Sequence, residues 1–83
     1  MDGYQIGDFY LKYSKDHERY DIMHKIYNIS SDKIHEYSLG YIQLYENDHV
    51  FICHPSIRYS YDEIDIIKQF MEVVINGNNK RKS

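Results

Sequence analysis

The chain has 83 residues, of which 28% are charged and 16% are aromatic, and its formal net charge is −3 at pH 7. This length suits one hydrophobic core, so we expect a single domain over residues 1–77 and a disordered basic tail over residues 78–83. Because three of the ten basic side chains lie in that tail, the domain itself is acidic and lacks the basic face with which duplex-binding domains neutralise phosphates.

The first half of the chain predicts two strands. Apolar residues alternate with polar ones over residues 7–14 and again over residues 20–26, a period that is typical of half-buried strands. Residues 20–28 also fit a helix, because some of their apolar residues recur at helical spacing. We favour a strand there, since β-branched and aromatic residues are frequent and alanine is absent from the chain.

A longer strand and a hairpin follow. Residues 34–45 alternate, and Gly40 near their middle predicts a bulge or a bend. The alternation places five side chains on one face of this strand: His35, Tyr37, Leu39, Tyr41 and Tyr45. Residues 46–48 form a short hairpin loop that leads to an apolar strand over residues 50–53, and Pro55 ends this strand.

The C-terminal segment predicts an amphipathic helix from Ser60 to Asn76. Ser60 and Glu63 match a capping box, and Gly77 follows as a stop signal. The expected core stripe consists of Ile64, Ile67, Phe70, Met71 and Val74. Three further residues widen the apolar arc beyond what one sheet face needs, namely Ile66, Val73 and Ile75. We predict that this flank contacts a second chain, which includes the possibility of a homodimer.

These elements predict an α+β fold, a small antiparallel β-meander of about four strands packed against one C-terminal α-helix. One helix covers only one face of such a sheet, so several of the ten tyrosines should lie on the open face. Our candidates for an interaction surface there are Tyr10, Tyr27, Tyr37 and Tyr41, because tyrosine combines a large contact area with a hydroxyl group for water. The alternative is that these side chains simply cover the sheet.

Three residues, His49, Cys53 and His54, form the tightest group of possible metal ligands. In an extended strand His49 and Cys53 stand about 13 Å apart, whereas zinc needs four ligands within about 2.3 Å. We therefore predict no metal and no other cofactor. Cys53 lies in an apolar run, which favours a buried core thiol over a nucleophile activated by His54; a small enzyme using Cys53 or a histidine is the least favoured alternative.

Small size, the aromatic excess and the lack of a catalytic motif favour a non-enzymatic protein-interaction module. Ile, Asn, Lys and Tyr dominate the composition, as expected of an A/T-rich genome, so we predict a phage, viral or mobile-element inhibitor or modulator of a host protein. The alternative is a module for a nucleotide or single-stranded RNA that uses tyrosines for stacking. No segment resembles a membrane span or a signal peptide, and the single cysteine suits a reducing compartment, so we expect a cytoplasmic protein.

Overall fold

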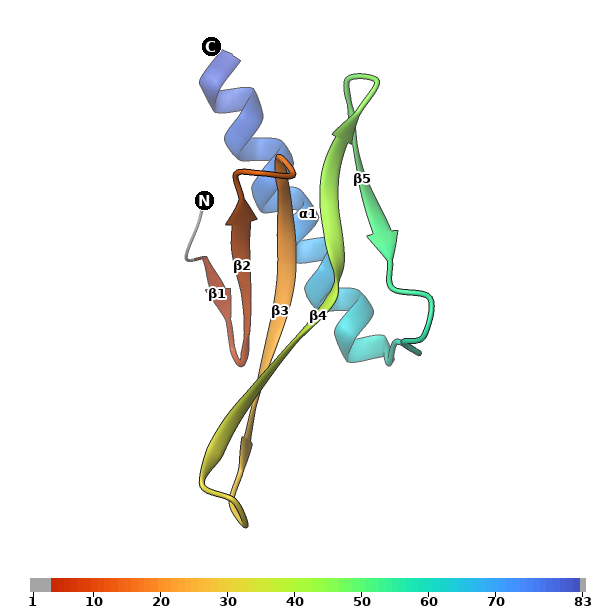
Figure 1. Cartoon of the computed structure of the whole chain (residues 1–83). Coiled ribbons are helices and arrows are strands. Elements are labelled where there is room, and N and C mark those ends of the chain that lie inside the picture. Colours follow the sequence, from red (N-terminus) through yellow and green to blue (C-terminus); the bar gives the residue numbers. More distant parts are fainter. Residues whose placement is uncertain (1–3, 83) are drawn as a thin grey trace.

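The computed structural model describes residues 4–82, with side chains up to residue 77. The strands are β1 (Gln5–Ile6), β2 (Phe9–Ser14), β3 (Arg19–Asn28), β4 (Lys33–Tyr45) and β5 (Asp48–Cys53), and they precede the helix α1 (Tyr61–Lys82). Within the described residues the strands form one antiparallel sheet in the order β1-β2-β3-β4-β5, with α1 against one face (Figure 1). This confirms an α+β meander with a single helix, but with five strands instead of about four. The additional strand is the two-residue β1.

Hairpin turns connect all the neighbouring strands. The loop between β4 and β5 consists of Glu46 and Asn47, whose φ angles of 50° and 72° are those of a type I′ turn. In the loop between β3 and β4, the Asn28 side-chain oxygen accepts hydrogen bonds from the backbone nitrogen of Ser30 at 3.1 Å and from its hydroxyl at 2.7 Å. These local bonds favour the reversal of the chain after Asn28. Because β3 spans Arg19–Asn28, the strand prediction for residues 20–28 is confirmed.

Gly40 lies at a β-bulge, as the sequence predicts. The register of β3 and β4 pairs Ile22 with Gly40 and Met23 with Ser38, so Leu39 is an extra residue on β4. An extra residue exchanges the faces of all side chains beyond it. The single predicted face of β4 is therefore wrong: Leu39 and Tyr37 lie on the face towards the helix, whereas Tyr41 and Tyr45 lie on the open face.

The start of α1 follows the predicted capping box. The Ser60 nitrogen donates to the Glu63 carboxylate at 2.9 Å, and the Glu63 nitrogen donates to the Ser60 hydroxyl at 3.2 Å. The predicted end at Gly77 is wrong, because the helix continues to Lys82; an interior glycine costs a helix only about 1 kcal/mol relative to alanine. The predicted disorder of residues 78–83 stays a prediction, because their side chains lie outside the described part.

The core lies between α1 and the centre of the sheet. Its buried residues come from β2, β3, β4 and α1: Leu11, Ile22, Leu39, Ile42, Ile67, Phe70 and Val74. Of the predicted helix stripe, Ile67, Phe70 and Val74 are buried and Met71 is partly buried, whereas Ile64 in the first turn is exposed. No polar side chain among the described residues is buried, so the core side chains are apolar, and the Tyr59 hydroxyl at their margin donates to the Leu39 carbonyl.

The two longest strands extend beyond the rest of the sheet. Pairing with β2 ends at His24, and pairing with β5 ends at Gly40, but β3 and β4 remain paired as far as Asn28 and Lys33. We call residues 26–35 the ribbon. Figure 1 shows that it projects past the helix and the other strands, and the molecule accordingly measures 48 Å in its longest dimension against 25 Å and 24 Å in the others.

Candidate functional site

The ribbon concentrates exposed apolar side chains. Four large residues lie within its ten positions, with exposed fractions from 41% for Ile26 to 86% for Ile29: Ile26, Tyr27, Ile29 and Ile34. Tyr27 and Ile34 are opposite each other on one face, whereas Ile26 faces the other way beside His35. A two-stranded ribbon has no third strand or helix against which to bury such residues. The apolar surface is therefore built into an element that projects from the core.

The turn of the ribbon is held by a tyrosine. The Tyr27 hydroxyl donates to the Asp32 carboxylate across the turn, where Asp32 has a positive φ of 53°. This hydrogen bond, with a smaller contribution from burial, raises the pKa of Tyr27 above its ordinary value. The bond links β3 to the last residue of the turn, directly before β4, so it joins the two sides of the turn.

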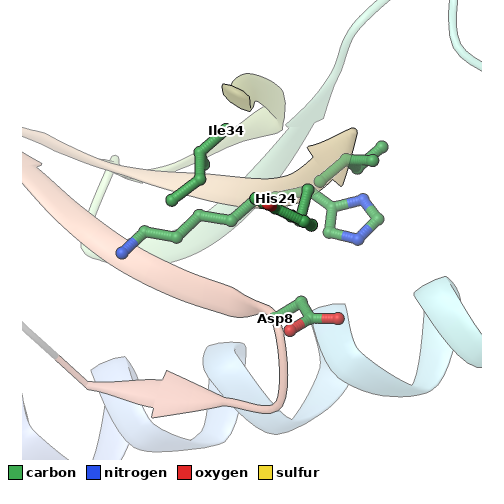
Figure 2. Close-up of a pocket in the computed structure, with 6 residues that line it drawn as sticks. Asp8, His24 and Ile34 are labelled. Carbon is green, nitrogen blue, oxygen red and sulfur yellow. The ribbon is translucent and has the colours of Figure 1, made fainter. Parts of the chain in front are cut away.

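A hollow of about 620 Å³ lies at the base of the ribbon. Its walls combine a carboxylate, an imidazole, an ammonium group and apolar side chains from Asp8, His24, Lys25, Ile26, Tyr27 and Ile34. In Figure 2, Asp8 lies at the turn before β2, and His24 and Ile34 come from the two strands of the hairpin. These groups suit a partner surface that carries both polar and apolar side chains.

His24 is held firmly beside this hollow. Its ring stacks on Phe9, with 4.0 Å between the ring centroids and 14° between the planes. On the other side, its Nδ1 atom lies 2.9 Å from the Tyr37 hydroxyl. Tyr37, one of the predicted interaction residues, therefore contacts His24 on the helix-side face and does not belong to the open face.

The other three predicted tyrosines lie on the open face, where cations cover two of them. The Lys25 ammonium lies 4.8 Å from the ring centroid of Tyr10, and the Arg19 guanidinium lies 4.0 Å from that of Tyr41. The Tyr10 hydroxyl donates to Glu36 at 2.9 Å. Partial burial, followed by the hydrogen bond and the charge of Glu36, raises the pKa of Tyr10. On this face, Tyr10 and Tyr41 therefore interact with charged side chains, Tyr10 with Lys25 and Glu36 and Tyr41 with Arg19.

The predicted helix flank is largely engaged by the core. Ile66 and Val73 are partly buried and pack against the buried residues, and Ile75 is exposed. Sequence reasoning instead missed the ribbon residues Ile26, Ile29 and Ile34. The signal that would have found them is strand length. Because β4 has thirteen residues and β5 has six, one end of β4 must extend beyond its pairing with β5.

Cys53 is exposed, which corrects the prediction of a buried thiol. It is the last residue of β5 at the edge of the sheet, and its opposite residue, Gly40, has no side chain to cover it. Cys53 contributes to a second hollow of about 380 Å³ next to the bulge, together with Arg19, Asp21 and Tyr41. No group of three His, Cys, Asp or Glu side chains in the described part of the chain is arranged to hold a metal ion.

Comparison with known protein families, curated proteins and solved structures finds no match to this chain. No helix formed by the described residues is long and apolar enough to cross a membrane. The function must therefore be argued from the surface of the chain itself.

Proposed function

We propose that this protein is a non-enzymatic interaction module that binds a partner protein through the ribbon. The observation that supports this proposal is the cluster of four exposed apolar residues on a two-stranded element that projects from the core. Single exposed apolar residues are common on protein surfaces, but a cluster of them marks interaction sites. A partner that covers the ribbon would supply the apolar contacts that the chain's own core does not give it.

The surroundings of the ribbon define the chemistry of this partner. Its apolar residues would meet Ile29 and Ile34, and its polar side chains would meet the Asp8 carboxylate and the Lys25 ammonium at the hollow. The composition of the chain leads us to propose a host protein as the partner, with inhibition or modulation of that host protein as the outcome of binding.

Nucleotide or RNA binding is less well supported by the open face. Base stacking needs an accessible ring face, and one face of Tyr10 and one face of Tyr41 are covered by Lys25 and Arg19. A base would have to displace the cation in order to stack on that face of either ring. We therefore retain the ribbon and a protein partner as the proposal.

The test compares two matched substitutions on β4. Ile34 in the ribbon is 62% exposed and Tyr45 at the other end of the strand is 64% exposed, so Ile34→Lys and Tyr45→Lys place the same charge on similarly exposed positions. The tagged wild-type chain should capture a stoichiometric partner from an extract of the cells in which it is made. Tyr45→Lys should retain that partner, whereas Ile34→Lys should bind it at least about tenfold more weakly, because a charge would enter the centre of the interface.

Two results would count against the proposal. One is the absence of any stoichiometric partner in the wild-type capture. The other is equal capture by the Ile34→Lys and Tyr45→Lys variants, which would place the interface elsewhere. Far-ultraviolet circular dichroism of both variants checks that each remains folded, so a loss of binding can be assigned to the ribbon surface.

A further inference from the structure

The two edges of the sheet differ in how they are protected. The edge strand β1 has two residues, too few to offer a pairing surface, whereas the edge strand β5 has six. Charged residues, prolines and bulges normally protect an edge strand; β5 has no proline, its only charged residue is Asp48, and the bulge lies on β4. Figure 1 shows α1 against one face of the sheet, and among the described residues β5 is the last strand of the sheet, paired on one side with β4 alone. The outer side of β5 is therefore open to a further strand.

We propose that β5 pairs antiparallel with β5 of a second copy of this chain, which makes one sheet continuous across a two-fold axis. With the two-fold axis at Phe51, residues 49–53 of β5 pair with residues 49–53 of the second copy. In that register Val50 lies opposite Ile52 of the second copy, so apolar side chains meet on the open face. At each end the Asp48 carboxylate lies opposite His54, which immediately follows the strand. Apolar contacts at the centre and polar pairs at both ends therefore match by symmetry.

The neighbouring symmetric registers are poorer. An axis at Val50 would place Asp48 opposite Ile52, a charge against an apolar side chain. An axis at Ile52 would place Phe51 opposite Cys53 and would move the pairing past the end of β5 towards Pro55, which has no backbone donor. Of these three registers, the one with the axis at Phe51 avoids both faults, because it places no charged side chain opposite an apolar one and does not extend to Pro55.

The size of the contact sets its strength. Pairing of two six-residue strands buries less surface than the roughly 1,200–2,000 Å² of stable interfaces. We therefore expect a weak dimer with a dissociation constant of about 10–100 μM. This inference goes beyond the proposed function and does not depend on it, because the ribbon lies beyond the segment of β4 that pairs with β5.

Sedimentation velocity of the full chain tests the inference. The wild type should shift from the 10.1 kDa monomer to twice that mass as its concentration rises through about 10–100 μM. Ile52→Lys places a charge in the centre of the pairing and should remain monomeric, whereas Ile34→Lys in the ribbon should dimerise like the wild type. A monomeric wild type at about 1 mM, a dimer that survives Ile52→Lys, or loss of the dimer in Ile34→Lys would overturn the inference.

Disulfide cross-linking tests the register and does not depend on how Ile52→Lys folds. In a Cys53→Ser background, the combined Val50→Cys and Ile52→Cys substitutions should give a cross-linked dimer, because these positions face each other across the axis. Either substitution alone should give no cross-linked dimer. The Cα atoms of the same residue in the two copies would lie about 7–8 Å apart, because these residues are diagonal neighbours, and this exceeds the usual Cα separation in a disulfide. Equal cross-linking by a single substitution, or none by the pair, would overturn the register.

Discussion

Gly40 is the position where a single added methyl group should harm the fold most. Its φ of 147° is one that residues with a side chain rarely adopt, and a Cβ atom built there would lie 2.5 Å from the Ile52 carbonyl oxygen and 2.6 Å from Cζ of Phe51. Backbone strain of this kind costs about 1–3 kcal/mol, and overpacking of a filled site costs about 1–3 kcal/mol more. Gly40→Ala should therefore lower the free energy of unfolding by about 2–6 kcal/mol, a large part of the total stability of a small domain.

Urea unfolding followed by far-ultraviolet circular dichroism measures this loss. Gly7→Ala provides the matched control, because Gly7 also has a positive φ, at 57°, but no atom lies within 4 Å of its Cβ position. That variant should lose only the strain, about 1–2 kcal/mol. Gly40→Ala should lose clearly more, since it adds the collision with β5. Equal losses for the two variants would refute the claim that close packing of β4 against β5 requires glycine at the bulge.

Three further predictions concern the core, the helix cap and pH. Phe70→Ala should lower the free energy of unfolding by about 3–5 kcal/mol in the same urea assay, because Phe70 is fully buried, whereas the exposed Ile75→Ala should change it by less than about 1 kcal/mol. Ser60→Ala removes the acceptor for the Glu63 nitrogen and should cost about 1 kcal/mol, with a matching loss in thermal midpoint by circular dichroism. The raised pKa of Tyr10 in the folded state means that its contribution to stability is present below pH 10 and is lost as the pH rises above it. Urea unfolding at about pH 9 and about pH 11 should therefore show a smaller alkaline loss for Tyr10→Phe than for the wild type.

Local patterns in the sequence predicted the four longer strands and the start of the helix, but not the two-residue β1 or the end of the helix. Alternation identified the long strands, the capping box fixed the start of the helix, and Gly40 marked the bulge. Each of these signals involves residues close together in the chain, so the physical cause is contained in the pattern. The end of the helix is different, because Gly77 carries a weak preference that neighbouring residues can override.

Side-chain faces and burial depend on which strands are neighbours, and a pattern in one strand does not contain that information. Predicting the bulge at Gly40 was not enough, because its consequence for Tyr41 follows only when Leu39 is recognised as the unpaired residue. The apolar run around Cys53 indicated burial, but the run forms an edge strand whose last residue has little to cover it. The ribbon likewise arises from unequal strand lengths, a property of the whole sheet.

If the chain dimerises through the β5 edge and binds its partner through the ribbon, the dimer is a bivalent binder. A two-fold axis at Phe51 gives each dimer two ribbons, and each ribbon retains its exposed Ile29 and Ile34. Two linked sites bind a partner that is itself dimeric or repetitive more tightly than one site does, because the second contact forms at a high effective concentration. Ile52→Lys should then weaken binding to such a partner without altering the ribbon, whereas Ile34→Lys should weaken binding to any partner. If both proposals hold and Ile52→Lys leaves partner binding unchanged, each partner molecule engages a single ribbon and the dimer contributes no avidity.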